Sequence, residues 1–413
     1  MKKIVRLTKN TAHKSGAMAA NIYYGFPGRK LRVIGVTGTD GKTTTCHLIY
    51  HILKNAGRAV SLTSSIYTDI GGVISDTGLH VTTQNHWLLQ KNLQAAVKAG
   101  CEFFVLETTS HALDQHRIWG INYEVGVLTN ITPEHLDYHK NFDEYVATKV
   151  KLLLKAQHAI VNKDADVFEK VCEILTKNNK QFTTYSIRTD ADFIWDARIK
   201  TSLKEDFNYE NIIAAYAACK KLGLSDEDVL KGIRTFQLPK GRVDKVYSGD
   251  FHVYIDFAHT PHSIRNLLSE LKRKKGRLIH VFGSAGLRDE KKRPDMGRAS
   301  GEYADVVVIT EEDYRAEDFM KISQSISGGL YECGFTYAEP DILMKQKEAT
   351  KIFTIIKNRE KAIMFGVKYA RRGDTVVCTG KSHEKSLARG DKEYPWDEYV
   401  SVMEALRKYK KKK

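Results

Sequence analysis

Short apolar runs alternate with amphipathic helical stretches through the first half of the chain. The runs with the length and β-branched composition of buried strands are residues 32–36, 103–107, 125–129 and 159–162. The stretches with helical spacing of apolar positions are residues 43–55, 87–99 and 142–156. Strands and helices that alternate in this way are typical of a parallel sheet covered by helices. The pattern therefore predicts an α/β fold.

The second half repeats the alternation after an interruption. A helical stretch at 211–222 is followed by the Leu-Pro-Lys-Gly-Arg loop at 238–242. The strands expected beyond it are residues 253–256, 278–282, 306–310 and 375–378. We place a domain boundary near residue 238, which gives a central domain over 31–237 and a Rossmann-like α/β domain with a basic tail over 238–413. Residues 1–30 are too few for a domain and are expected to be an extension or linker remnant.

Composition and net charge indicate the expected cellular compartment and the charge of the expected partners. Of 413 residues, 42% are hydrophobic and 28% charged, which is typical of a globular protein, and the N-terminus lacks the apolar stretch of a signal peptide. No apolar stretch is long enough to span a membrane, so we expect a cytoplasmic protein. The six cysteines are scattered, which argues against a disulfide or zinc scaffold. The net charge of +15 favours anionic partners. The basic tail 407–413 is expected to be either a solvated, frayed end or a weak electrostatic anchor.

A glycine-rich segment joins the first strand to the first helix. Backbone N–H groups of such a turn and of the helix start can bind phosphates. Lys42 adds a cation, and Thr43 or Thr44 can offer a hydroxyl to Mg²⁺. The strict Walker pattern is absent, and a purely structural turn is the alternative. ATP is the predicted cofactor, bound through Gly38, Thr39, Gly41, Lys42, Thr43 and Thr44.

The segment 38–45, Gly-Thr-Asp-Gly-Lys-Thr-Thr-Thr, resembles the phosphate loop of the Mur ligase family. These ATP-dependent ligases add amino acids to peptidoglycan precursors. Further segments, in order from about residue 22 to 400, resemble the branch that adds the third amino acid of the peptide. The resemblance implies a P-loop ATPase domain followed by a C-terminal ligase domain.

The chain from 106 to 117 begins at a strand end, where open α/β sheets bind ligands. Glu107 is the natural Mg²⁺ ligand there, and the alternative is a carboxylate that caps a helix. The segment resembles the family motif E-x-S-S-H-x-L-x-Q-x-R, with Thr109 in place of the first serine. The residues then implied in binding the acceptor are Thr82, Thr83, Ser110, Gln115 and Arg117.

Two more metal-site residues follow from the resemblance. The segment 129–139 resembles T-N-[IL]-x-x-[DE]-H-L-D, which makes His135 a ligand of a second Mg²⁺, although spacing alone leaves it as a loop histidine. Lys149 matches the lysine that many members carbamylate, and from the sequence alone it could equally be an exposed helix residue. The implied metal ligands are Thr43, Glu107, His135 and Lys149, for two Mg²⁺ ions.

Other matches concern the nucleotide. Asn208 and Asn211 resemble the F-N-x-x-N asparagines that approach the adenine, and Asn208 could instead be a helix N-cap. Asp256 and His259 match a D-Y-A-H-x-P motif that meets the nucleotide, with Phe257 replacing the tyrosine.

The basic segment 283–294 resembles G-x-x-G-x-R-D-x-x-K-R-P. Arg288 is then the candidate to bind phosphates, and Arg293 the candidate to bind the carboxylate of the incoming amino acid. A solvated basic loop is the alternative reading of the same residues.

Residues 312–315, Glu-Asp-Tyr-Arg, occupy the place of the D-N-P-R motif that selects diaminopimelate. Arg315 keeps the arginine for a distal carboxylate, whereas the carboxylate of Asp313 suits a terminal ammonium such as that of lysine or ornithine. Gly380 and Glu384 match the motif that holds the zwitterionic end. We expect a diamino acid.

The implied activity is an ATP-dependent, ADP-forming acid–amino-acid ligase that works through an acyl phosphate. Its catalytic residues would be Lys42, Glu107, His135, Lys149 and Arg288. The family's N-terminal nucleotide-sugar-binding domain has no counterpart in about 30 residues, so the muramoyl-peptide acceptor need not be a UDP-sugar. The alternatives are a cyanophycin-like or poly-γ-glutamate-type ligase, or a non-catalytic ligase-like partner. We expect a monomer without nucleic-acid partners.

Overall fold

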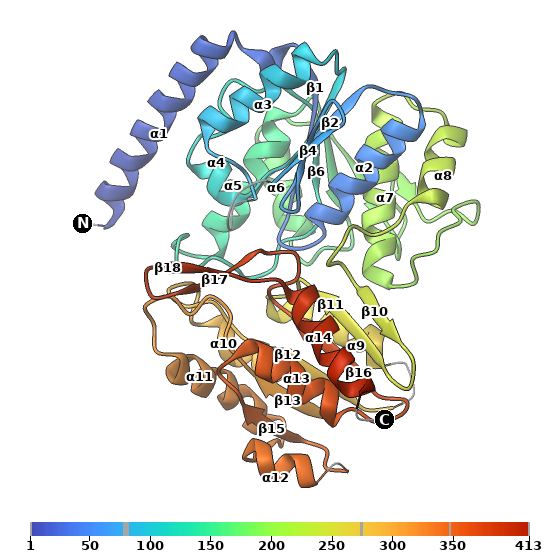
Figure 1. Ribbon diagram of the computed structural model, residues 1–413. Helices are drawn as coiled ribbons and strands as arrows, with labels where there is room; N and C mark the ends of the chain where they lie inside the picture. The colour runs from blue at the N-terminus through green and yellow to red at the C-terminus, as the bar shows by residue number, and fades with distance from the viewer. Residues whose placement is uncertain (1, 77–81, 273–275, 347, 412–413) are drawn as a thin grey trace. The chain divides into compact units, whose positions relative to one another are not determined.

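The computed structural model describes residues 2–76, 82–272, 276–346 and 348–411 (Figure 1). The chain divides into two compact units, Met1–Gln237 and Leu238–Lys413. Within the described residues, no helix is both long and apolar enough to cross a membrane. All six cysteines are free thiols.

The first unit is built on a sheet that has nine strands in the described residues, in the order β4-β3-β2-β5-β1-β6-β7-β8-β9. The strands are β1 (Arg32–Thr37), β2 (Val60–Thr63), β3 (Thr68–Ile70), β4 (Val73–Ser75), β5 (Phe103–Glu107), β6 (Tyr123–Leu128), β7 (His158–Asn162), β8 (Phe182–Ser186) and β9 (Phe193–Ile194). The pairs from β2 to β9 are parallel, whereas β3 and β4 pair antiparallel. The predicted central parallel sheet is confirmed, and it becomes mixed at this edge, where a Gly-Gly turn joins two three-residue strands.

Helices cover this sheet in two groups. The helices are α1 (Lys2–Tyr24), α2 (Lys42–Asn55), α3 (His86–Lys98), α4 (Ser110–Asp114), α5 (Phe142–Lys155), α6 (Phe168–Lys177), α7 (Asp206–Lys221) and α8 (Asp226–Thr235), with a 3-10 turn at Pro27–Arg29. Helix α2 packs against α7 and α8, whereas α5 packs against α4 and α6. Helix α7 begins five residues before the predicted position 211.

Residues 1–30 are mostly helical, which the sequence analysis did not predict. Helix α1 lies against α3 and is followed by the 3-10 turn. The side-chain amide of Asn21 fixes its C-terminal end by donating to the carbonyl oxygens of Ala17 and Trp119. The extension is thus a packed helix of the first unit.

The second unit has a seven-stranded sheet in the described residues, ordered β10-β11-β16-β12-β13-β15-β14, in which only β10 is antiparallel to its neighbour. Its strands are β10 (Asp244–Ser248), β11 (His252–Asp256), β12 (Leu278–Phe282), β13 (Val306–Ile309), β14 (Thr336–Tyr337), β15 (Ile352–Ile355) and β16 (Thr375–Thr379). A separate antiparallel pair consists of β17 (Ser386–Arg389) and β18 (Lys392–Pro395).

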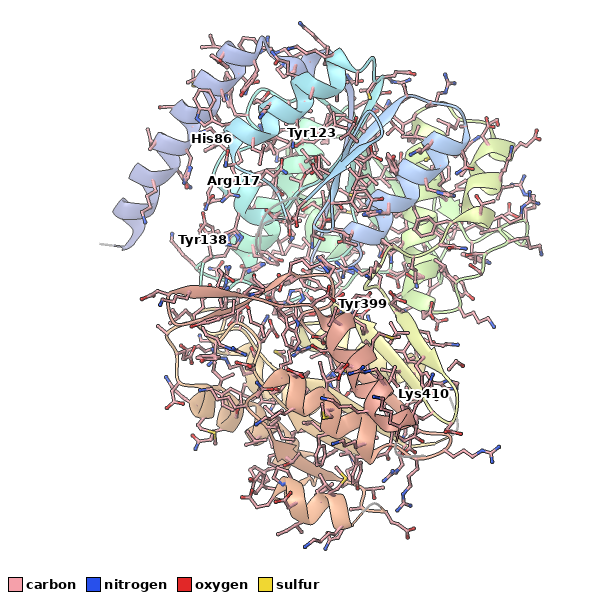
Figure 2. All side chains as sticks on the ribbon, in the orientation of Figure 1. His86, Arg117, Tyr123, Tyr138, Tyr399 and Lys410 are labelled. Carbon is pink, nitrogen blue, oxygen red and sulfur yellow. The ribbon has the colours of Figure 1, made fainter. Side chains whose placement is uncertain are left out.

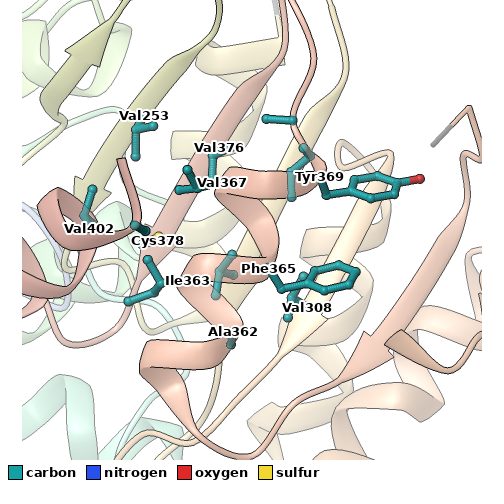
Figure 3. Close-up of a cluster of buried hydrophobic side chains, with 14 of the residues drawn as sticks. Val253, Val308, Ala362, Ile363, Phe365, Val367, Tyr369, Val376, Cys378 and Val402 are labelled. Atoms are coloured by element: carbon teal, nitrogen blue, oxygen red, sulfur yellow. The ribbon is translucent and has the colours of Figure 1, made fainter. Parts of the chain in front are cut away.

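Helices cover both faces of the second sheet. They are α9 (Pro261–Lys272), α10 (Lys292–Gly301), α11 (Phe319–Glu332), α12 (Pro340–Lys345), α13 (Arg359–Tyr369) and α14 (Glu398–Lys410). Apolar residues of α9, α10 and α11 form one buried cluster with the strands. Those of α13 and α14 form another, in which Ile363 and Val402 meet Val253 and Val376 of the sheet (Figure 3). This unit is a three-layer α/β structure.

The basic tail is more ordered than predicted. Residues Arg407 to Lys410 form the last turn of α14. The Tyr409 ring packs edge-on against Phe251, with 5.1 Å between ring centroids, and its hydroxyl donates to Asp250 at 3.3 Å. The prediction of a frayed end is therefore wrong for this turn, because one aromatic residue anchors it. Arg407, Lys408 and Lys410 are exposed.

Candidate active site

The phosphate loop connects the end of β1 to the start of α2. Gly38 and Gly41 have φ values of 152° and 80°, a region that side chains disfavour. A Cβ at Gly38 would overlap Thr129 Oγ1, and one at Gly41 would overlap Asn211 Oδ1. The loop is therefore a tight cradle whose backbone can approach a ligand closely. It opens at the N-terminus of α2, which favours an anionic group such as a phosphate.

Side chains fix the conformation of this loop. Thr39 Oγ1 lies 3.2 Å from Tyr145 Oη and accepts the Thr132 N–H at 3.0 Å. The Asp40 N–H donates to Asn130 Oδ1 at 2.9 Å. The Lys42 ammonium donates to Thr39 O at 2.7 Å. Lys42 is thus held over the loop, where its charge suits a nucleotide phosphate.

Three oxygen-bearing side chains meet beside the loop. Thr43 Oγ1 donates to Glu107 Oε1 at 3.1 Å, and Ser65 Oγ lies 3.0 Å from Thr43 Oγ1. The Ser65 N–H donates to Glu107 Oε2 at 2.8 Å. Hydroxyl and carboxylate oxygens are the ligands that Mg²⁺ prefers, so this cluster fits a magnesium ion accompanying ATP. Sequence reasoning missed Ser65, which lies two residues after a short strand without a motif of its own.

Lys149 is buried in α5 with 2% exposure, so the alternative of an exposed helix residue is wrong. Its ammonium donates to Gly38 O at 2.6 Å and lies 4.6 Å from the centre of the Tyr145 ring. Burial, reinforced by the nearby positive charge of Lys42, holds the pKa of Lys149 well below its ordinary value. The phosphate loop therefore has a second, desolvated amine on its backbone side.

His135 lies in a loop and has a φ of 56°. Its ring packs edge-on against His111, with centroids 4.8 Å apart, and lies 6.2 Å from the Tyr145 ring. Among the described residues, no three His, Cys, Asp or Glu side chains are arranged to hold a metal by themselves. A metal at this site would therefore rely on hydroxyls, substrate oxygens and water in addition to Glu107.

The predicted acceptor residues form a connected network after β5. Thr83 Oγ1 donates to Glu107 O at 2.9 Å and accepts the Thr109 N–H at 3.0 Å. Arg117 donates from Nη1 to Thr83 O and from Nε to Gln115 Oε1, both at 2.8 Å. These contacts bring four of the predicted positions together at one edge of the sheet.

Three further residues belong to this region. Ser110 Oγ is buried and has no hydrogen-bond partner among the described residues, so it is a polar atom that a bound acceptor could satisfy. Thr82 is half-buried beside Thr83. Tyr138, which sequence reasoning did not single out, accepts from Gln115 at 3.4 Å and donates to Asp114 at 2.8 Å (Figure 2).

The two asparagines near the phosphate loop lie inside α7. The N-cap of this helix is Glu205, so the N-cap alternative for Asn208 is wrong. Asn211 Oδ1 accepts from Thr45 Oγ1 at 3.2 Å, and Asn211 Nδ2 donates to Asn208 Oδ1 at 3.4 Å. Both side chains are buried. Asn211 thus connects α7 to α2, the helix that follows the phosphate loop, and Asn208 is hydrogen-bonded to Asn211.

In the second unit, Asp256 ends β11. Its carboxylate accepts the N–H groups of Ala258 at 2.6 Å and Val243 at 2.7 Å, and burial raises its pKa. His259 Nδ1 lies 2.9 Å from Phe257 O, and the Phe257 ring lies between the rings of His259 and His383, 4.8 Å from each. The phenylalanine thus packs as an aromatic ring between two histidines.

The two arginines of the basic loop have different environments. Arg288 is exposed on the loop before α10. Arg293 is 1% exposed and donates from its terminal nitrogens to both carboxylate oxygens of Glu317, at 2.6 and 2.7 Å. Glu317 thus occupies both terminal nitrogens, whereas the buried Nε has no hydrogen-bond partner among the described residues. The solvated-loop alternative is therefore wrong for Arg293.

The residues predicted to select the amino acid form a charged cluster. Lys381 is fully buried and donates to Asp313 Oδ1 at 2.9 Å and to Glu384. The Ala388 N–H also donates to Asp313 Oδ1, at 2.9 Å. The charge of Asp313 is thus paired within the protein, and its predicted role towards a substrate ammonium stays a prediction.

Arg315 and Glu312 flank this cluster. Arg315 has a φ of 52° and donates to Gly286 O at 2.8 Å, and its side chain is 22% exposed. Glu312 is buried, and burial and the adjacent Asp313 charge raise its pKa. A Cβ at Gly380, which has a φ of 101°, would come within 2.6 Å of Glu312 Oε2. The positive φ, rather than the nearby end of the Glu312 side chain, favours glycine at position 380.

A phosphate cradle beside an oxygen cluster that fits Mg²⁺, with a second α/β unit that carries buried charged side chains, suits a nucleotide-dependent enzyme such as a ligase. Comparison with known protein families agrees: residues 36–219 match the Mur ligase middle domain, and residues 241–382 match the Mur ligase glutamate ligase domain. The chain belongs to the Mur ligase family and is an ATP-dependent acid–amino-acid ligase.

Individual relatives give the same result. The chain is 34% identical to the UDP-N-acetylmuramoyl-L-alanyl-D-glutamate–2,6-diaminopimelate ligase of Trichormus variabilis, over 97% of this chain and 82% of that protein. A solved structure of a ligase with the same name is 26% identical, with a TM-score of 0.58, over 92% of this chain and 79% of that one. Folylpolyglutamate synthase of Mycobacterium tuberculosis, at 17% identity over 89% and 92% of the chains, shares the fold with a TM-score of 0.69.

Proposed function

We propose that this ligase joins diaminopimelate to the terminal carboxylate of a muramoyl dipeptide. The observation that carries the proposal is the contact between Thr43 and Glu107 beside the phosphate cradle, with Lys42 held over the loop. These are the groups that phosphoryl transfer to a carboxylate requires. The identity of the substrates is supported by relatives that carry these two substrates in their names.

The chemistry divides into two steps. The acceptor carboxylate attacks the terminal phosphorus of ATP, releasing ADP and forming an acyl phosphate. The amine of the incoming amino acid then attacks the acyl carbon, phosphate leaves, and the ammonium proton is lost to solvent. Thr43 and Glu107 would hold Mg²⁺, which when bound would supply positive charge to offset that of the transferring group. Lys42 stabilises the same charge, and the Arg117 network places the acceptor.

Lys149 fits a structural role in the metal site. Its nitrogen is buried behind Gly38, and an uncharged amine can react with carbon dioxide to give an anionic carbamate. We infer that this carbamate supplies an oxygen ligand for a second Mg²⁺, together with His135. Mass spectrometry of the intact protein in bicarbonate buffer, which adds 44 Da for one carbamate, tests this directly against the Lys149→Met variant.

The paired charge of Asp313 favours diaminopimelate over lysine or ornithine. With Asp313 bound to Lys381 and the Ala388 N–H, Arg315 is the predicted cation for the distal end of the amino acid; its Nη2 lies 3.9 Å from Asp313 Oδ2, and its side chain is 22% exposed. A guanidinium binds a carboxylate in a forked geometry. The distal end is therefore a carboxylate, as in diaminopimelate.

The deciding experiment is ATP-dependent phosphate release. The purified full chain is given UDP-N-acetylmuramoyl-L-Ala-D-Glu with meso-diaminopimelate, lysine or ornithine, omitting each substrate in turn. We expect release that requires the acceptor and diaminopimelate together. Release with lysine alone would overturn the assignment of the amino acid, and ATP binding without any release would overturn the assignment of the acceptor. Lys42→Met is the inactive control, and exposed Lys54→Met is its matched partner on the same helix.

A further inference from the structure

The N-terminal helix α1 and the neighbouring helix α3 carry no acidic residue. Helix α1 has five lysines and arginines, and α3 has Lys91 and Lys98. The described lysines of the two packed helices, Lys9, Lys14, Lys91 and Lys98, are all exposed and give a positive surface, and a carboxylate that contacts α1 is Asp114 of α4, which accepts from Asn10. Such a surface attracts an anionic partner.

The same helices expose large apolar side chains. Helix α1 turns its small residues Ala17 and Ala20 inward, where both are fully buried, whereas Ile22 and Tyr23 remain 66% and 74% exposed. An ordinary amphipathic helix buries its large apolar residues and exposes polar ones. The inverted arrangement indicates that the outer face contacts something other than water.

Helix α3 extends this apolar face. The Trp87 ring is 44% exposed and packs edge-on against Tyr23, with centroids 5.9 Å apart, and Tyr24 lies 6.3 Å from Trp87. Leu88 is 38% exposed and Met18 39%. We call this surface the α1/α3 face; its members are Met18, Ile22, Tyr23, Trp87 and Leu88.

Exposed lysines border the α1/α3 face. Lys14 lies one helical turn before Met18, and Lys91 lies one turn after Trp87. Aromatic and aliphatic residues flanked by lysines are typical of surfaces that lie in the headgroup region of a membrane. A nucleic-acid surface would instead place basic side chains at its centre, which here is apolar.

We propose that the α1/α3 face binds the surface of an anionic phospholipid membrane, with the tryptophan and tyrosine rings among the headgroups and the lysines paired with lipid phosphates. The contact is peripheral and reversible. Its chemistry is independent of the proposed ligase reaction.

Vesicle co-sedimentation of the full chain tests the proposal. We expect binding to vesicles with anionic phosphatidylglycerol, with little binding to vesicles of phosphatidylcholine alone. Because lysines contribute, binding should fall as salt rises from about 50 to 300 mM. The Debye length shortens over this range, so the attraction between the lysines and the lipid phosphates is screened more strongly. The Ile22→Glu/Trp87→Glu variant should bind about tenfold or more weakly, since two apolar anchors become repelled charges.

Matched control variants distinguish vesicle binding through the α1/α3 face from non-specific binding by other exposed apolar residues. Helix α14 also exposes two apolar residues, Val400 at 65% and Met403 at 56%, and carries basic residues in its last turn, but it includes two glutamates. The Val400→Glu/Met403→Glu variant should bind vesicles as the unchanged protein does. Lys14→Glu/Lys91→Glu should weaken binding and remove its salt dependence, with the melting temperature unchanged in all variants.

Four results would overturn the proposal. The first is equal binding to neutral and anionic vesicles, and the second is equal loss in the α14 control. The third is a concentration-dependent dimer, seen by light scattering, that the Ile22→Glu/Trp87→Glu variant abolishes while no vesicle binding occurs; a second copy would then be the occupant. Salt-sensitive binding to duplex DNA without vesicle binding would likewise assign the face to nucleic acid.

Discussion

The two units hold their ligand-binding residues in different ways. Around the phosphate loop of the first unit, hydroxyl groups and backbone atoms make most contacts, as between Thr43, Ser65 and Glu107. In the second unit, buried ion pairs dominate, with Arg293 bound to Glu317 and Lys381 bound to Asp313 and Glu384. Removing a partner from a buried pair leaves an uncompensated charge, whereas removing a half-exposed cation does not. The contrast predicts that substitutions at the first site reduce activity, and that substitutions at the second reduce stability as well.

The largest effect is expected for Lys42→Met. The ammonium lies over the loop at 2.7 Å from Thr39 O, where it can stabilise the transferring phosphoryl group. We expect kcat to fall by about 10³-fold, the scale found for removing one charged donor from a phosphoryl-transfer site. The midpoint of chemical denaturation should be unchanged. Steady-state phosphate release and urea unfolding check the two parts, and a large loss of stability would contradict the comparison.

The next effect concerns the buried pair in the second unit. Arg293→Ala leaves the Glu317 carboxylate without its bidentate partner, and we expect a loss of about 3 kcal/mol in the free energy of unfolding. The Arg293→Leu/Glu317→Leu double variant should recover much of that loss, because neither charge remains. Urea denaturation of the unchanged protein, Arg293→Leu, Glu317→Leu and the double variant gives the coupling energy. An Arg293→Ala protein of unchanged stability would mean that the pair is not formed in solution.

The fold was largely predictable from periodicity, but its edges were not. The central parallel strands are near-continuous apolar runs, and β5 and β12 have the predicted bounds. Strands β3 and β4 are three residues each, and β4 is fully exposed, so neither has an apolar period to detect. Helix α1 was missed because its inward face is made of alanines, which give no apolar spacing.

The sequence predicted the positions of the candidate site residues, but not the hydrogen bonds and ion pairs that these residues form. Glu107, Lys149 and Asn211 were found from strand ends and motifs. Their partners were not: Ser65 and Glu317 are brought in by tertiary structure from segments without motifs. Asp313 pairs with Lys381, 68 positions further along the chain, and the sequence has no signal for that pairing.

A smaller effect tests whether the second unit is also the more acid-sensitive. His280 is fully buried between Ser300 Oγ at 2.9 Å and Thr379 Oγ1 at 3.0 Å, and burial lowers its pKa from 6.5 to about 3. Below pH 6.5, His280 therefore binds a proton in the unfolded chain but stays neutral in the folded chain. The free energy of unfolding thus falls as the pH drops from 6.5 towards 3. At pH 4.5 this contribution is about 2 to 3 kcal/mol. The stability difference between His280→Gln and the unchanged protein should shift by this amount between pH 7.5 and pH 4.5, and a constant difference would exclude the effect.

The smallest effect is expected for Asp313→Asn, which removes the charge of the side chain and keeps its shape. It therefore tests how far the ligand-binding residues of the second unit depend on charge alone. The amide oxygen of asparagine can still accept from Lys381 and from the Ala388 N–H, and Glu384 still pairs with Lys381. We expect stability to change by about 1 kcal/mol or less, because no buried charge is left unpaired. If Asp313 serves only to hold Lys381, KM for diaminopimelate should change only a fewfold and lysine should remain a poor substrate. If Asp313 instead reads a substrate ammonium, the variant should lose activity with a lysine substrate far more than with diaminopimelate. KM is measured for both amino acids with Asp313→Asn and with Asp313→Ala, which leaves the Ala388 N–H and Lys381 without this acceptor. The comparison distinguishes a positioning role of Asp313 from direct recognition of the substrate.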